Sequence, residues 1–271
     1  MLIFAVGFVA YPFFKTFLYS FSRVNFKGEI TGFVGLENYR YLFSRKDFSI
    51  ALTNTLKLAL INTPVPLVLT LLLAALTERR KPGSWLYELC FALPMAVSMS
   101  AAALIFKILL NPTVGYVNHL FGWQLGWYED RATALYGIAV LTVWMGIGFN
   151  YLLFLGALRG VPGPLMEAAL LDGAGPVRRF FRIQLPMISP TVFYMICTNL
   201  VLALMTSGPV IIITDGGPAR STTTLIFMMY SSGYGSSNYS MAACISVVTF
   251  ALTLLFTLGS FAWEGKKVHY Q

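Results

Sequence analysis

Long apolar segments separated by short polar stretches run along the whole chain. An α-helix needs about 20 predominantly apolar residues to cross a hydrocarbon core of roughly 30 Å. The pattern therefore predicts an all-α, polytopic integral membrane protein with six transmembrane helices. The predicted spans are Met1–Ser20, Ala51–Thr77, Trp85–Leu110, Ala134–Leu158, Met187–Ser207 and Tyr239–Trp263.

Two connecting segments need a separate interpretation. Phe21–Ile50 carries charges of both signs and reads as a loop with an interfacial aromatic end. Gly208–Asn238 contains two apolar pieces, Pro209–Thr214 and Leu225–Tyr230, that are too short to cross a membrane. We expect a re-entrant or pocket-lining excursion there, and a plain loop remains the alternative. The first span starts without a basic flank, so we also expect that an N-terminal piece is missing.

The composition supports a membrane protein. Of the 271 residues 57% are hydrophobic and 11% charged, and the mean hydropathy is +0.70. A soluble domain of this size is much more polar. The net charge of +8 comes from Lys and Arg scattered between apolar segments, a pattern that sets topology rather than one that binds nucleic acid. We expect one membrane domain, residues 1–271.

Basic residues distinguish the two sides of the predicted membrane domain, because cytoplasmic loops carry an excess of Lys and Arg. The loops richer in uncompensated basic residues should therefore face the cytoplasm. They are the turn Glu78–Lys81, the loop 159–190 and the C-terminus. The bases concerned are Arg79, Arg80, Lys81, Arg159, Arg178, Arg179, Arg182, Lys266 and Lys267.

The loop 159–190 contains signals for two short helices. Pro164, with Glu167 in the first turn, favours a helix over Leu165–Leu171, and glycines then end it. Ala168 and Ala169 would present a small-residue face to a close partner. A second amphipathic piece, Val177–Ile183, should put its apolar side chains on one surface and its three arginines elsewhere.

The same loop resembles the signature loop of permeases of binding-protein-dependent ABC importers. The resemblance implies that the first short helix docks in a groove of a separate ATPase, with Glu167 as polar contact and Gly173 as hinge. An ordinary alanine-rich helix would explain the Glu-Ala-Ala run alone, but not the full spaced set. The matching residues are Glu167, Ala168, Ala169, Asp172, Gly173, Ala174, Phe180, Ile183, Leu185, Pro186 and Pro190.

Other motifs look like those of the carbohydrate-uptake branch, in particular the first-permease type similar to the maltose and glycerol-3-phosphate systems. They are Phe33–Tyr39, Asn111-Pro112, Gly216-Gly217-Pro218, Thr222–Leu225 and Lys267–Tyr270. The resemblance implies a second, non-identical permease, two ATPase subunits that carry ATP and Mg²⁺, and an extracytoplasmic solute-binding protein. It implies no cofactor on this chain. Oligosaccharide, monosaccharide and glycerol-3-phosphate all remain possible solutes.

Polar side chains inside predicted spans are candidates for a solute pathway. Lys107 would supply a cation, although it and Lys57 lie near enough to the outer boundary to snorkel. Amide or hydroxyl groups could meet solute hydroxyls, but hydrogen bonds between helices explain them at least as well. These candidates are Asn150, Tyr151, Asn199 and Ser207.

No enzymatic site is visible in the sequence. The run Gly216–Thr222 lacks the spacing and the lysine of a phosphate loop. Cys90, Cys197 and Cys244 read as small buried hydrophobes without metal-ligand spacing. Two other functions remain to be weighed against an importer permease. An ion-coupled secondary transporter would need internal symmetry or a buried charge pair, and an assembly factor would leave the docking loop without a purpose.

Overall fold

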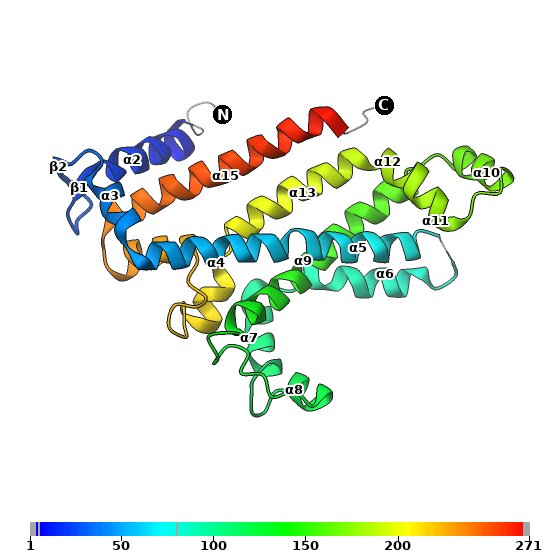
Figure 1. Cartoon of the computed structure of the whole chain (residues 1–271), viewed down its shortest axis with the longest axis horizontal. Coiled ribbons are helices and arrows are strands. Elements are labelled where there is room, and N and C mark those ends of the chain that lie inside the picture. Colours follow the sequence, from blue (N-terminus) through cyan, green and yellow to red (C-terminus); the bar gives the residue numbers. More distant parts are fainter. Residues whose placement is uncertain (1–3, 5, 80, 268–271) are drawn as a thin grey trace. The chain divides into compact units, whose positions relative to one another are not determined.

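The computed structural model describes residues 4, 6–79 and 81–267, and these are mostly helical (Figure 1). Short π-helical turns, among them Val6–Ala10 and Phe180–Gln184, extend or join several helices. The α-helices are α2 (Tyr11–Ser20), α3 (Glu37–Ser44), α4 (Lys46–Asn62), α5 (Pro64–Thr77), α6 (Ser84–Ala92), α7 (Met99–Leu109), α8 (Tyr116–Phe121), α9 (Ala134–Arg159), α10 (Gly163–Leu171), α11 (Pro176–Arg179), α12 (Leu185–Met187), α13 (Ser189–Leu204), α14 (Leu225–Tyr230) and α15 (Tyr239–Lys267).

A small β-hairpin corrects the all-helical expectation. Strands β1 (Ser22–Val24) and β2 (Ile30–Phe33) pair antiparallel, with Arg23 opposite Gly32. The side chain of Asn38 in α3 donates to the carbonyl oxygens of Ser20 and Ser22, at 2.9 and 3.1 Å. The asparagine of the Phe33–Tyr39 motif thus satisfies backbone groups where α2 ends and β1 begins.

Within the described residues, three helical segments are long and apolar enough to cross a membrane. They are Lys46–Thr77, which joins α4 and α5, Ala134–Arg159, and Tyr239–Ala262. The predicted spans at these places are confirmed as candidates, although the first begins five residues earlier than expected. Pro64 at the start of α5 lacks an N–H, which accounts for the interruption between α4 and α5.

Two predicted spans are not single straight helices. Ser84–Ala96 and Met99–Leu109 meet at 102°, and Pro176–Met187 meets Ser189–Leu204 at 71°. In the first pair Val97 adopts an extended conformation directly after a 3₁₀ turn that contains Pro94, so the helix cannot continue. The predicted span Trp85–Leu110 is therefore a bent pair of helices, which counts as one candidate span only if the two pieces cross the membrane together. The chain is a multi-pass protein with three to five candidate spans in the described part.

The chain divides into two compact units. The first comprises residues 1–58, 107–138 and 204–256. Its core joins residues of α3 and α4 to residues of α14 and α15. The buried members are Leu42, Phe48, Ala51, Leu225, Met228, Met241, Cys244 and Ile245.

The second unit comprises residues 59–106, 139–203 and 257–271. Its core combines side chains of α5, α9 and α13, and it also includes Ile188, which precedes α13. Cys90 of this unit is exposed, contrary to the expectation that all three cysteines are buried. The core residues are Leu67, Ala74, Tyr151, Phe154, Leu155, Leu158, Ile188 and Met195.

Candidate functional site

Helix α10 is the first helix of the predicted docking loop. It begins at Gly163, ahead of Pro164, so Glu167 lies beyond the first turn and not within it as predicted. Glu167 and Ala168 are exposed, whereas Ala169 is buried at 8% exposure. The helix therefore keeps one alanine against the protein and turns the acid and the other alanine outward.

The end of α10 explains the Asp172-Gly173-Ala174 run. Gly173 has a φ of +73°, and its N–H donates to the carbonyl of Leu170 at 3.0 Å. The N–H of Ala174 donates to the carbonyl of Ala169 at 2.9 Å. This pair of bonds is a Schellman motif, which needs a left-handed residue that glycine adopts without strain. The motif ends α10 at a defined residue.

The second helical piece of the loop 159–190 consists of α11, the turn Phe180–Gln184 and α12. Phe180 and Leu185 pack against the core of the second unit, and Ile183 is half-buried. Phe181 and Pro186 are exposed. Arg179 is buried, and its Nε has no hydrogen-bond partner among the described residues. The expected division, with the apolar side chains on one surface and the three arginines elsewhere, is therefore not observed, because Arg179 is buried and Phe181 exposed.

Large apolar side chains project from α10 and α11. Leu171 is 89% exposed and Val177 70%, and Leu165 and Leu170 are also exposed. Large apolar residues gathered on one polar loop are typical of a surface that binds another protein. This segment therefore has the composition and the exposure of a docking element.

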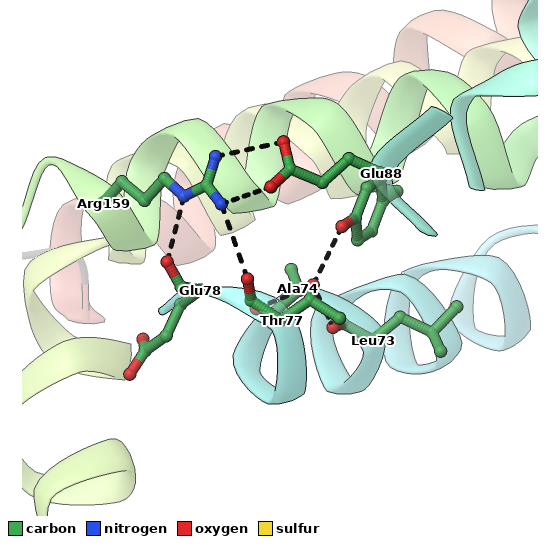
Figure 2. A network of polar contacts seen from close by, with 7 residues as sticks. Leu73, Ala74, Thr77, Glu78, Glu88 and Arg159 are labelled. Atoms are coloured by element: carbon green, nitrogen blue, oxygen red, sulfur yellow. Dashed lines mark hydrogen bonds and ion pairs between the residues drawn. The ribbon is translucent and has the colours of Figure 1, made fainter. Parts of the chain in front are cut away.

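A network of polar contacts holds the base of this segment, and the sequence interpretation missed it. Figure 2 shows the guanidinium of Arg159, at the end of α9, directed toward both carboxylate oxygens of Glu88 in α6. Arg159 Nε also donates to the carbonyl of Glu78 at 3.0 Å. The side chain of Gln184 donates to the carboxylate of Glu78. The charges near predicted span ends were visible in the sequence, but their pairing was not.

The five predicted solute-pathway residues have different surroundings. Asn150 in α9 and Asn199 in α13 are buried and exchange side-chain hydrogen bonds of 3.0 and 3.1 Å. Tyr151 is buried, and its hydroxyl lies 2.8 Å from Thr77 Oγ1. These three side chains therefore make contacts between helices, which is the alternative to a role in the solute pathway. Lys107 is exposed on α7, and the carbonyl of Ser207 accepts from Ile211 N–H at 2.9 Å.

The excursion after α13 is held by α4. Asn54 donates to the carbonyls of Arg220 and Thr223, and Thr55 Oγ1 accepts from the N–H of Leu225 at 2.9 Å. Thr224 caps α14 by accepting from the N–H of Phe227. The excursion contributes to a cavity of about 670 Å³ in the first unit, a pocket-lining role that we expected.

Comparison with known proteins agrees with these features. The family model described as binding-protein-dependent transport system inner membrane component matches residues 66–263. The sn-glycerol-3-phosphate transport system permease protein UgpA of Pectobacterium atrosepticum is 36% identical over 274 residues, covering 100% of this chain and 93% of that protein. UgpA of Salmonella typhimurium matches with the same identity and coverage.

Solved structures share the fold. A bacterial ABC transporter involved in the import of the acidic polysaccharide alginate matches with a TM-score of 0.87 and 20% identity, over 98% of this chain and 92% of that chain. The MetNI methionine ABC transporter matches with a TM-score of 0.60 and 15% identity, over 86% of this chain and 99% of that chain. The chain belongs to the family of inner membrane components of binding-protein-dependent transport systems.

Proposed function

We propose that this chain is one of two unlike permease subunits of an ATP-driven importer for a sugar or a glycerol-3-phosphate-like solute. The UgpA relatives are named for glycerol-3-phosphate, and the alginate importer is named for an acidic polysaccharide. Both names fit the carbohydrate-uptake motifs of the sequence. The coarser function, a permease component of an ABC importer, follows from the family.

The proposed assembly contains a second, non-identical permease, two ATPase subunits and an extracytoplasmic solute-binding protein. A solved alginate transporter is described in complex with a periplasmic protein bound to an alginate pentasaccharide, which supports the last of these. ATP and Mg²⁺ would sit on the ATPase subunits. We propose six spans within one permease domain, residues 1–271, with a cytoplasmic C-terminus. Residues 268–271 lie outside the described part of the chain.

The exposure and the defined end of helix α10, within residues 159–190, carry the proposal. Helix α10 is short and ends at a Schellman motif, and it presents Glu167 and Leu171 outward while Ala169 is buried. An ATPase groove could hold such a helix through apolar contact around one polar contact. Residues 159–190 would then be the cytoplasmic docking loop.

The polar contacts of residues 159–190 with α5 and α6 support a route by which ATPase closure would reach the spans. Gln184 bonds Glu78 at the end of α5, and Arg159 joins the same end to Glu88 in α6. A displacement of residues 159–190 by a closing ATPase would act on α5, α6 and α9 together, because these contacts join the ends of α5 and α9 to the middle of α6. Packed elements tied in this way move as a group. Alternating access requires such a coupled movement of spans.

Charge reversal at Glu167 tests the docking proposal. Glu167→Lys should abolish co-purification of the ATPase and ATP-driven uptake in proteoliposomes, while Glu167→Gln should retain part of both. The matched control is Glu129→Lys, which reverses an exposed charge in a different loop and should retain both. Normal uptake by Glu167→Lys would overturn the docking role.

Reconstitution also separates the importer from a secondary transporter. Uptake driven by a proton gradient, without any ATPase subunit, would overturn the proposed function. The solute class is tested on the partner: a thermal-shift screen of the cognate binding protein should find its largest stabilisation with a sugar or a glycerol phosphate. Stabilisation by neither class would overturn the proposed solute.

A further inference from the structure

A second cavity in the first unit, of about 330 Å³, has two basic side chains in its wall. Lys57 comes from α4, and Arg131 comes from the segment just before α9. The volume falls in the range of about 300–1,000 Å³ that small-molecule sites occupy. Lys57 and Arg131 are far apart in sequence, so only the fold brings them to one place.

The two cations have no carboxylate partner among the described residues, and the cavity wall there includes no acidic side chain. Asp47 in α4 is engaged by Arg45 and Arg220. Asp130, next to Arg131, accepts the N–H of Ala132 at 3.0 Å. Two positive charges without counter-ions in one wall favour an anionic ligand.

Hydrogen-bonding groups of the same wall add to this preference. The hydroxyl of Ser221 is buried and has no hydrogen-bond partner in the described chain. Such a group costs free energy unless a ligand or water satisfies it. Asn54 holds the backbone on both sides of Ser221, through the carbonyls of Arg220 and Thr223 at 3.2 and 3.0 Å. The donor is therefore held in place before a ligand arrives.

We propose that this cavity binds a phosphate group, with Lys57 and Arg131 neutralising its charge. Phosphate offers several acceptor oxygens, and Arg and Lys are the usual side chains that bind it. Snorkelling alone would explain an isolated Lys57, but it does not explain a second cation in the same wall.

The phosphate could belong to a solute or to a lipid headgroup. The choice of solute rests on the proposed function, since a glycerol-3-phosphate-like solute carries this group. The binding test below uses neither ATP nor the binding protein, so it can fail while uptake succeeds, and the reverse is also possible.

The experiment measures how fast Lys57 is acetylated in the purified importer in phospholipid-free detergent, with mass spectrometry as readout. Millimolar sn-glycerol 3-phosphate should slow acetylation of Lys57 several-fold, and glycerol should not. Lys27, an exposed lysine of the hairpin turn, is the internal control and should react at an unchanged rate. Protection by phosphatidylglycerol alone would assign the phosphate site to a lipid. Protection by neither compound would overturn the proposal.

Variants of Arg131 make the test specific, because they keep Lys57, whose acetylation is measured. Arg131→Gln should raise the concentration of sn-glycerol 3-phosphate that protects Lys57 by roughly tenfold, the usual order for a lost charge-assisted contact. Arg131→Lys should recover part of this loss. Arg23→Gln, in the exposed hairpin, is the matched control and should change nothing. Equal protection in Arg131→Gln and wild type would overturn the two-cation site.

Discussion

Arg159 Nη2 lies 2.6 Å from one carboxylate oxygen of Glu88, and Arg159 Nη1 lies 3.3 Å from the other. The same guanidinium reaches the carbonyl of Glu78 through Nε, at the end of α5 (Figure 2). Carbonyls at a helix C-terminus lack intrahelical donors, and a cation there is favourable. One side chain thus joins the ends of α5 and α9 to the middle of α6.

The first prediction concerns these contacts of the Arg159 guanidinium. Arg159→Lys keeps the charge but cannot make the parallel bonds or reach the Glu78 carbonyl at the same time. We expect the unfolding free energy to fall by about 1.5–3 kcal/mol, the usual scale for hydrogen bonds to charged groups. Thermal unfolding of the purified complex measures the change.

A double-mutant cycle with Glu88→Gln assigns the effect to the pair. Coupling of about 1 kcal/mol between Arg159→Lys and Glu88→Gln would be expected for groups in direct contact. Strictly additive effects would mean that the two side chains do not stabilise each other. Arg23→Lys, on the hairpin, should leave the melting temperature unchanged.

The second prediction concerns Gly173. Its φ of +73° strains any β-branched residue, although among the described residues no atom beyond its two chain neighbours lies within 4 Å of the position that a Cβ would take. Gly173→Val should therefore disturb the end of α10 through the backbone and not through a clash, at a cost of about 1–3 kcal/mol. Solute-stimulated ATPase activity of the reconstituted importer should be largely lost.

Gly173→Asn is the matched variant, because asparagine tolerates the left-handed conformation better than other residues with a side chain. It should retain most of the stimulated activity. If valine and asparagine were equally harmful, bulk against the ATPase would be the cause and the conformational argument would be wrong.

The third prediction separates two roles of Asn150 and Asn199. If their main role is to bond each other, Asn150→Leu removes the side-chain hydrogen-bond partner of the buried Asn199 amide. We expect a loss of roughly 0.6–2 kcal/mol, as for polar contacts between membrane helices. The double variant with Asn199→Leu should recover part of that stability, because no buried amide remains.

Uptake kinetics complete this test. An importer with both leucines should keep the KM for its solute if the pair is only a contact between helices. A raised KM in the double variant, together with a normal melting temperature, would return both residues to the solute pathway.

Much of the docking segment could be predicted from the sequence because its signals are local. Pro164 fixes its own φ and Gly173 admits the left-handed conformation that ends a helix, so helix ends near them follow without knowledge of the rest. The apolar pattern likewise predicted Ala134–Leu158 within two residues of the observed α9.

Bends and partners could not be predicted in this way. A hydropathy window treats Trp85–Leu110 as one span, because it averages over Pro94 and the extended residue Val97 that break it. Asn150 and Asn199, 49 residues apart, are each an isolated amide in the sequence, equally suited to a solute or to another helix.

By itself the sequence determined that the protein spans a membrane and carries a short helix within residues 159–190, because hydropathy and the conformational preferences of Pro and Gly are properties of neighbouring residues. Only the tertiary structure decided what anchors the loop 159–190, since Gln184 of this loop donates to Glu78 across 106 residues of chain. It also decided that Lys57 and Arg131 share a cavity. Charges and amides act over a few ångströms in space, and the order of residues does not reveal which of them fall within that distance.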